Sequence, residues 1–239
     1  MEPRAIAIVF AGGSGTRMGN AIPKQFIEID GKPILTHTLE LFQRHPRIAA
    51  IYLAVHADYV DDAKKLAVAA GIDKLAGVVA GGDSAQASIY NALQLARSSG
   101  ERDDAVALIH DGVRPYVDAA VLDANIDAVL EHGSAVTFTP CVETLVISQD
   151  GKTIDALPYR RESYTAQAPQ SFRLGDVIAA HDRIRSREDG YKDMIDQATI
   201  CWTLGIPIHL VPGNRGNIKV TTPEDLVVLD ALLKWRRGQ

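Results

Sequence analysis

Residues 5–19 read AIAIVFAGGSGTRMG, a short apolar run followed directly by a glycine-rich segment. The apolar run over residues 5–10 is typical of a buried strand. Gly12, Gly13 and Gly15 follow, and residues without a side chain let the backbone approach a ligand closely and turn its N–H groups toward it. Because such donors suit phosphate oxygens, we expect a phosphate-binding loop at the end of the first strand.

Two cationic residues follow these glycines. Arg17 lies within the loop, and Lys24 comes seven residues later. Two familiar phosphate-binding motifs do not fit: no lysine follows a glycine in the G-x-x-x-x-G-K-[ST] spacing, and the G-x-G-x-x-G fingerprint would require a glycine where Met18 stands. A tight turn with no ligand is the simplest alternative, but it leaves the two flanking cations without a role.

Strand-like and helical patterns alternate after the loop. Apolar spacing predicts helices over residues 33–42, 59–70 and 84–98, and β-branched runs predict strands over residues 50–55, 77–80 and 105–110. This alternation implies right-handed βαβ units, and therefore an α/β fold with a mostly parallel sheet flanked by helices. Ligands of such sheets bind outside the carboxyl ends of the strands, which directs attention to the segments after them, residues 11–24, 81–88 and 111–115.

The second half of the chain has a different pattern. Strand-like runs at residues 134–140, 143–148 and 154–159 surround the turn signal Asp150-Gly151, which predicts a projecting hairpin. We therefore expect one domain over residues 1–239 with a β-arm at about residues 134–165. Because an isolated hairpin is only marginally stable, this β-arm favours dimerisation. Further patterns predict a helix at 177–187, a strand at 207–211 and a C-terminal helix at 223–234, with Thr222 as its N-cap.

Composition excludes several classes of protein. The net charge of -5 argues against a general nucleic-acid binder. No run reaches the roughly 20 apolar residues of a membrane helix, and the N-terminus passes directly into a strand-like run without a signal-peptide pattern. Cys141 and Cys201 have no metal-ligand spacing and are expected to be reduced. Together these features predict a cytoplasmic protein that has neither a nucleic-acid nor a membrane partner.

Five motifs in order carry a resemblance to a known family. They are AGGSGTRMG, PKQF, HDGVRP, APQSF and NIKVTTPEDL, and they span about residues 6–233. The chain resembles the bacterial cytidylyltransferases that make CDP-methylerythritol or CDP-ribitol. The resemblance implies transfer of CMP from CTP to a small polyol phosphate with release of pyrophosphate. It also implies a Rossmann-like nucleotidyltransferase fold, a homodimer with an exchanged β-arm, and Mg²⁺ as cofactor.

The resemblance assigns roles to residues of the first half and to one lysine of the second half. Catalysis would rest on cations that stabilise the triphosphate and its transition state, namely Arg17, Lys24 and Lys219. A carboxylate at the end of a strand is well placed for Mg²⁺, so Asp111 is the expected metal ligand. His110 beside it either belongs to the site or merely fills space. The expected nucleotide-binding residues are Ala11, Gly12, Gly13, Gly15, Gly82, Ser88 and Asp111.

The acceptor site is expected to use residues from both halves of the chain. By resemblance, Arg114, Thr144 and Arg160 bind the acceptor, the last two across a dimer interface. Arg161 is the alternative to Arg160 because the motif is counted back from Ala168-Pro169-Gln170. Tyr159 replaces the polar residue that the family usually has before this arginine. Asp196, in a segment that is acidic in the family, serves either the site or the structure.

The sequence departs from the family at a position that affects base recognition. Ala85 stands where the family often has an arginine in GG-x-x-R-x-x-S. A uridylyl or guanylyl transferase is therefore a near alternative. An NAD-dependent oxidoreductase and a catalytically silent CTP-sensing module are more distant ones.

Two small motifs bear on the identity of the acceptor. Methylerythritol enzymes tend to have A-A-G in the loop and H-D-A-A-R-P after the fourth strand, whereas this chain has A-G-G and H-D-G-V-R-P. These differences favour a ribitol 5-phosphate-type acceptor. 2-C-methyl-D-erythritol 4-phosphate is the alternative.

Overall fold

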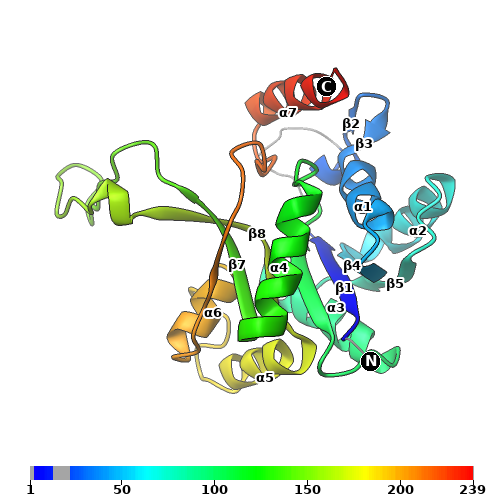
Figure 1. Ribbon diagram of the computed structural model, residues 1–239, viewed down its shortest axis with the longest axis horizontal. Coiled ribbons are helices and arrows are strands. Elements are labelled where there is room, and N and C mark those ends of the chain that lie inside the picture. Colours follow the sequence, from blue (N-terminus) through cyan, green and yellow to red (C-terminus); the bar gives the residue numbers. More distant parts are fainter. Residues whose placement is uncertain (1–2, 13–21, 239) are drawn as a thin grey trace.

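The computed structural model describes residues 3–12 and 22–238, and its centre is a seven-stranded sheet (Figure 1). The strands lie in the order β5-β4-β1-β6-β8-β7-β9. Only β8 runs antiparallel to its neighbours, since β6 and β7 both pair with it in antiparallel fashion while the remaining pairs are parallel. The strands are β1 (Ala5–Ala11), β4 (Ile48–Val55), β5 (Leu75–Ala80), β6 (Val106–Asp111), β7 (Ser134–Pro140), β8 (Tyr164–Arg173) and β9 (Leu210–Pro212). The predicted α/β class with a mostly parallel sheet is confirmed.

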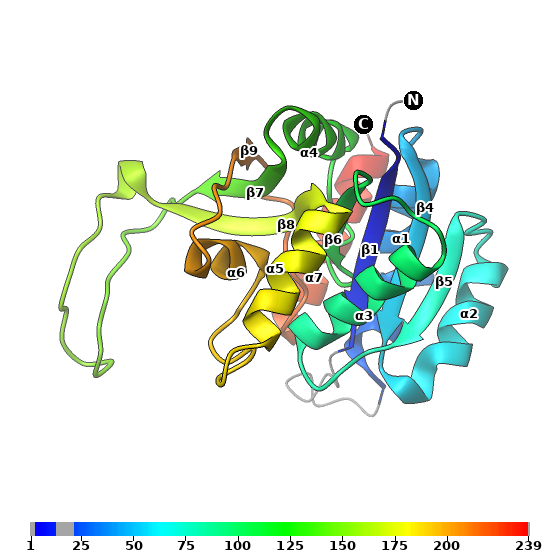
Figure 2. The same cartoon turned by 90° about the horizontal axis from the view of Figure 1, so that it is seen from below.

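Helices cover both faces of this sheet (Figure 2). One face packs against α1 (Ile34–Arg44), α2 (Val60–Ala69) and α4 (Ala119–His132). The other face packs against α3 (Ala85–Ser98) and α5 (Leu174–Arg185), with α6 (Gln197–Thr203) beside them. Burial on both faces explains why β1 is apolar throughout: Val9 belongs to the first core and Ile8 to the second.

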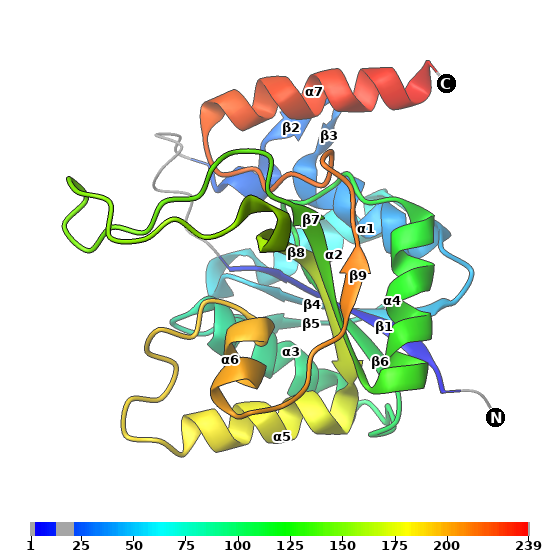
Figure 3. The ribbon, with the colours of Figure 1, turned by 60° about the vertical axis from the view of Figure 1, so that its left-hand side comes forward.

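A smaller layer lies above the carboxyl ends of β1 and β6. The short strands β2 (Glu28–Ile29) and β3 (Lys32–Pro33) pair with each other, and α7 (Pro223–Arg237) packs near them (Figure 3). A third buried cluster, which includes Ile34, Val220 and Leu229, joins this layer to the body. Helix α7 begins where predicted, with a capping box between Thr222 and Asp225. This layer fixes the segment that precedes α7 over the sheet end.

The β-arm projects from the body (Figure 1), but its outer part is less regular than predicted. The expected strands at 143–148 and 154–159 are reduced to one bridge between Ile147 and Ala156. The predicted turn forms: Asp150 accepts backbone hydrogen bonds from residues 152 and 153, and Gly151 has a φ of 68°. The extended partner of β7 is instead β8, a strand that the sequence patterns did not predict.

Three single-turn helices complete the described chain, η2 (Lys24–Phe26), η3 (Ala57–Tyr59) and η4 (Arg160–Glu162). Among the described residues, no helix is long and apolar enough to span a membrane.

Candidate active site

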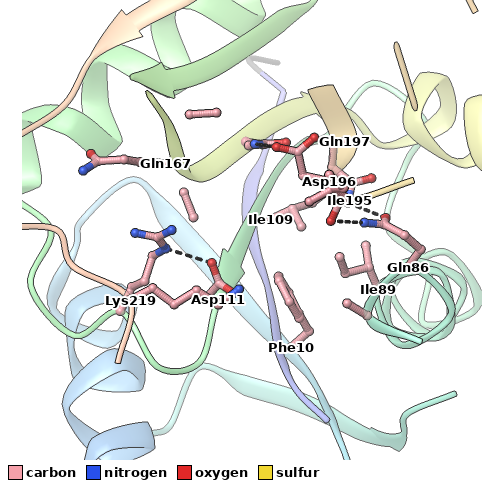
Figure 4. Close-up of a pocket in the computed structure, with 15 residues that line it drawn as sticks. Phe10, Gln86, Ile89, Ile109, Asp111, Gln167, Ile195, Asp196, Gln197 and Lys219 are labelled. Carbon is pink, nitrogen blue, oxygen red and sulfur yellow. Dashed lines mark hydrogen bonds and ion pairs between the residues drawn. The ribbon is translucent and has the colours of Figure 1, made fainter. Parts of the chain in front are cut away.

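Two adjoining cavities lie at the carboxyl end of the parallel strands, where the sequence predicted the site. The larger, about 360 Å³, is lined by Ala11, Gly12, Lys24, Gly82, Ser88 and others, and is called the glycine-loop cavity because Gly12 is the first glycine of the glycine-rich segment. The smaller, about 190 Å³, is called the glutamine cavity (Figure 4); it is lined by Gln86, Gln167, Gln170 and Gln197 among others. Phe10, Ala85, Asp111 and Lys219 line both cavities, so these four side chains form their common boundary.

Asp111 ends β6 and is the charged centre of this boundary. The Lys219 ammonium lies 2.6 Å from its Oδ1, and the Arg114 guanidinium donates to its Oδ2 at 2.8 Å. Burial alone would raise the pKa of Asp111, but the two cations outweigh burial and hold this pKa below its usual value. The carboxylate is therefore charged at neutral pH. The structure thus brings together three predicted site residues that are far apart in the sequence.

Arg114 lies on the glutamine-cavity side of this boundary and is held by the main chain. Its guanidinium donates to the carbonyl of Asn217 at 2.8 Å, and its own carbonyl contacts Nε2 of His110 at 3.0 Å. The fully buried side chain of Asn217 in turn donates to the carbonyl of Ala168. The sequence reasoning did not single out Asn217; its place two residues before Lys219, in the motif NIKV, is the signal that was available.

His110 is a structural residue. It has no exposed surface, it packs edge-on against Phe42 with ring centroids 5.2 Å apart, and burial lowers its pKa to about 4. The imidazole is therefore neutral and supports the loop that carries Arg114. Of the two interpretations that the sequence left open, the structure favours space-filling.

Lys24 enters the glycine-loop cavity from η2. Its ammonium donates to the carbonyl of Val220 at 2.9 Å, beside Lys219 in the sequence. Gln25, which is 1% exposed, donates from Nε2 to the carbonyl of Ala11 at 2.8 Å and so fixes η2 to the end of β1. Gly13, Gly15 and Arg17 lie outside the described residues.

Ser88 marks the point where two loops approach the start of α3. Its hydroxyl accepts a hydrogen bond from the backbone N–H of Gly82 at 3.1 Å and donates to the carbonyl of Ser84 at 2.9 Å. A Cβ added at Gly81 would lie 2.7 Å from the Ser88 hydroxyl oxygen, and one added at Gly12 would lie 3.0 Å from it. Packing against Ser88 therefore favours glycine at both positions, and the backbone of Gly12 lines the glycine-loop cavity.

The predicted acceptor residues of the β-arm lie elsewhere. Thr144 and Arg160 are exposed and line neither cavity of their own chain. Arg160 lies with Arg161 and Tyr159 around a separate shallow pocket at the base of the outer arm. Within one chain, the structure does not bring Thr144 and Arg160 to Asp111.

Asp196 has a structural role on the wall of the glutamine cavity. It caps α6, accepting hydrogen bonds from the N–H and hydroxyl of Thr199 at 2.8 Å each. Its other carboxylate oxygen accepts from Gln170 at 2.9 Å. Among the described residues, no group of three or more His, Cys, Asp or Glu side chains is arranged to hold a metal ion.

Comparisons with known proteins agree with this geometry. Residues 5–235 match the family model of IspD, 2-C-methyl-D-erythritol 4-phosphate cytidylyltransferase. The chain is 40% identical to a ribitol-5-phosphate cytidylyltransferase of Streptococcus agalactiae serotype V over 98% of this chain and 97% of the relative. It is 38% identical to a 2-C-methyl-D-erythritol 4-phosphate cytidylyltransferase of Syntrophus aciditrophicus over the full length of both. It also resembles the solved 4-diphosphocytidyl-2C-methyl-D-erythritol synthase of Anaerococcus prevotii, with a TM-score of 0.81, 26% identity and coverage of 97% and 96% of the two chains.

Proposed function

This chain belongs to the IspD family of cytidylyltransferases, and we propose that within this family it transfers CMP from CTP to ribitol 5-phosphate, with release of pyrophosphate. The observation that carries the proposal is the boundary between the two cavities. Lys219 and Asp111 face both cavities, whereas Lys24 lines only the glycine-loop cavity and Arg114 only the glutamine cavity. Cations on both sides of one carboxylate suit a reaction that brings two phosphate groups together.

The glycine-loop cavity is the proposed CTP site. Its open backbone at Gly12 and Gly82, with Ser88 behind them, would receive the nucleoside, while Lys24 and Lys219 face the triphosphate. Ala11, Gly13, Gly15 and Arg17 complete this proposed site. The acceptor phosphate is already an anionic nucleophile near neutral pH, because its second pKa is about 6.

In the reaction, an oxygen of the acceptor phosphate forms a bond to the α-phosphorus of CTP. The bond from that phosphorus to the bridging oxygen of the β-phosphate breaks, and pyrophosphate leaves with the electron pair. No general base is needed for this step. The protein has to reduce the repulsion between the two anions and to align them for the reaction. We therefore assign the main catalytic role to the cations Arg17, Lys24 and Lys219.

Mg²⁺ fits this site through Asp111. Its carboxylate is the one acidic side chain on the boundary, its pKa is held low, and each of its oxygens has lone pairs beyond those used by Lys219 and Arg114. Mg²⁺ in nucleotide enzymes is commonly held by one or two carboxylates together with substrate phosphates. The bound ion would neutralise charge on the triphosphate. The ammonium of Lys219 and the guanidinium of Arg114 keep Asp111 oriented toward both cavities.

A second copy of the chain completes the proposed acceptor site. Thr144 and Arg160 would reach the acceptor phosphate beside Arg114 from the β-arm of a partner. Two features support a homodimer. The β-arm projects from the body (Figure 1), and its outer part exposes large apolar side chains, including Val146, Ile147, Ile154, Leu157 and Tyr159. Exposed apolar groups of this number favour burial against another chain.

The methylerythritol acceptor is the second candidate, and one full-length relative at 38% identity favours it. This chain departs from that type at Gly12, Gly112 and Val113, and the two glycine positions are crowded. A Cβ at Gly112 would lie 2.8 Å from the Cβ of Ala11, and one at Gly12 would lie 3.0 Å from the Ser88 hydroxyl. These contacts explain why glycine stands at both positions, and the ribitol-type assignment is supported by the motif differences together with the relative at 40% identity.

A cytoplasmic location is part of the same proposal. Both cysteines are free, Cys201 is buried, and burial raises the pKa of its thiol to about 12. Two unpaired thiols are typical of a reducing compartment.

Pyrophosphate release tests the proposal. The enzyme would be assayed with Mg²⁺ and CTP, with ribitol 5-phosphate and 2-C-methyl-D-erythritol 4-phosphate in parallel, and with UTP in place of CTP as the control. Turnover of ribitol 5-phosphate with CTP alone is the expected result. Preferential turnover of the methylerythritol compound would overturn the acceptor assignment.

A further inference from the structure

The backbone that carries Lys219 is irregular, and its position depends on contacts with other elements. Residues 213–222, called the Lys219 segment, join β9 to α7 and contain neither strand nor helix (Figure 3). The N–H of Gly213 donates to a carbonyl of β7 at 2.7 Å, and the N–H of Val220 donates to a carbonyl of the loop after β6 at 3.0 Å. These two bonds fix the ends of the segment, so side chains must place the part between them.

Five residues outside the two cavities hold this middle part. They are Tyr116, Asp118, Asn214, Gly216 and Arg236, called the Arg236 cluster, and none of them lines either cavity. Arg236, in the last turn of α7, donates to Oδ1 of Asp118 at 2.7 Å. The other carboxylate oxygen of Asp118 accepts a hydrogen bond from the side-chain amide of Asn214. The last turn of α7 is therefore tied back to the segment that leads into the helix.

The ring of Tyr116 is the apolar part of the cluster. It is 5% exposed, and the guanidinium carbon of Arg236 lies 3.6 Å from the ring centroid, in cation–π geometry. A Cβ added at Gly216 would lie 2.6 Å from Cε1 of the ring. The ring therefore packs directly against the main chain of the Lys219 segment, three residues before the lysine.

Asp118 does not have the role that its place in the chain predicts. It precedes α4 as the N-cap residue, where an aspartate usually accepts a hydrogen bond from a backbone N–H of the first turn. Its side chain makes no such capping bond. Its two oxygens instead bind Arg236 and Asn214. The carboxylate thus stabilises the link between α7 and the Lys219 segment rather than the start of α4.

The link continues from Asn214 to the boundary between the cavities. Oδ1 of Asn214 accepts from the backbone N–H of Asn217 at 2.8 Å, and the carbonyl of Asn217 accepts from Arg114 at 2.8 Å. Arg114 donates to Asp111, and Lys219, two residues after Asn217, contacts the same carboxylate. A continuous chain of contacts therefore connects the last turn of α7 to both cations of the boundary.

We infer that Arg236 is a positioning residue for the transfer reaction, which acts by holding the Lys219 segment in place relative to Asp111. This inference rests on the proposed function, because Lys219 and Arg114 receive their roles there. Misplacement of a catalytic group by about 1 Å can cost about 100-fold in rate. Loss of the Arg236 contacts should therefore lower kcat more than it weakens the binding of CTP.

Two neighbouring arginines of α7 provide the test and its matched control. Arg237 pairs with Asp30, in the turn between β2 and β3, at 2.8 Å, so Arg237→Ala also removes one ion pair of α7 but leaves the Arg236 cluster intact. We expect Arg236→Ala to lower kcat at least tenfold and to keep the Kd of CTP, measured by calorimetry, within about threefold. Arg237→Ala should keep kcat within about twofold, with a similar change in Tm.

Two further variants test the chain of contacts itself. Arg236→Lys keeps a cation for Asp118 and for the Tyr116 ring, and should return kcat to within about threefold of the wild type. Asp118→Ala breaks the chain at its next member, so the double variant of Arg236→Ala and Asp118→Ala should lose no more activity than the weaker of the two single variants. Hydrogen exchange measures the segment directly. It should be faster over residues 213–220 in Arg236→Ala and unchanged there in Arg237→Ala.

The outcomes separate this inference from the proposed function. Equal losses of kcat in Arg236→Ala and Arg237→Ala would show that each arginine merely fastens α7, and would overturn the inference. Losses that multiply in the double variant, or unchanged exchange over residues 213–220 in Arg236→Ala, would overturn it as well. Failure of the wild type to turn over any polyol phosphate with CTP would instead reject the proposed function, and the exchange comparison would still decide whether Arg236 holds the segment.

Discussion

The two halves of β8 show how differently the body and the β-arm are built. The inner half, from Ala168 to Phe172, is buried between β6 and β7, and Gln170 there holds the wall of the glutamine cavity. The outer half, from Tyr164 to Ala166, is exposed and continues into the outer β-arm. In the body, the charged residues of the site pair with one another. On the β-arm, Arg160 and the apolar side chains are exposed. The comparison teaches that the described part of one chain brings Lys24, Asp111 and Lys219 to one place, whereas the proposed acceptor residues Thr144 and Arg160 lie apart from them.

The largest expected effect comes from the body. Lys24→Ala removes a cation from the proposed triphosphate site, and we expect kcat to fall by about 10²–10³-fold, the usual range for losing one transition-state donor. Pyrophosphate release measures the rate, and circular dichroism measures whether the fold is retained. Lys65→Ala, on the exposed face of α2, is the matched control. Near-wild-type turnover of the Lys24 variant would reject the proposed triphosphate site.

A smaller effect is expected from the β-arm. Arg160→Ala should raise the KM for the acceptor about 10- to 100-fold, the value of one charge-assisted hydrogen bond, with little change for CTP. Arg161→Ala is its neighbour control, and steady-state kinetics with each substrate varied in turn makes the measurement. Equal effects on both substrates would contradict the assignment of Arg160 to the acceptor, and a larger effect at Arg161 would move the role to that residue.

The smallest expected effect is on stability and concerns the body again. Burial lowers the pKa of His181 to about 4, whereas an unfolded histidine titrates near 6.5. Between these values the unfolded chain binds more protons, so the free energy of unfolding should fall as pH is lowered from about 6.5 to 4. His181→Asn should reduce the slope of the unfolding free energy against pH by an amount that corresponds to about one bound proton. Urea unfolding at three pH values measures the slope, and parallel slopes for the two proteins would contradict the buried neutral state.

Local signals predicted much of the body. The apolar run before the glycines became β1, and Thr222 with Pro223 marked the start of α7. Strand β8 was missed because YTAQAPQSFR has no regular alternation and contains Pro169, which cannot donate to a ladder. The pairing of β7 with β8 shifts register near that residue. Helix α4 was also missed, although Val121, Leu122 and Val129 have helical spacing and Gly133 ends the helix.

The sequence predicted which charged residues belong to the candidate site, but not which residues contact one another there. Motif order singled out Asp111, Arg114 and Lys219, and the structure places them within hydrogen-bond distance. No motif indicated the glutamine cavity, because Gln86, Gln170 and Gln197 come from three distant elements and meet only through the fold. Residue spacing along the chain carries no information about such a meeting. Asn217 was also missed, although it lies two residues before Lys219 in the motif NIKV.

A complementation measurement tests most directly whether each site combines the body of one chain with the β-arm of another. Mixed dimers of Lys24→Ala and Arg160→Ala chains would be co-expressed with two affinity tags, purified through both, and assayed for pyrophosphate release at an acceptor concentration near the wild-type KM and far below the KM of the Arg160→Ala enzyme. Exchange of arms leaves one site with both residues intact, so these dimers should regain about half of the wild-type activity. Dimers of a wild-type chain with a doubly substituted chain should be almost inactive. The reverse pattern, inactive first dimers and half-active second ones, would show that each site is built from a single chain.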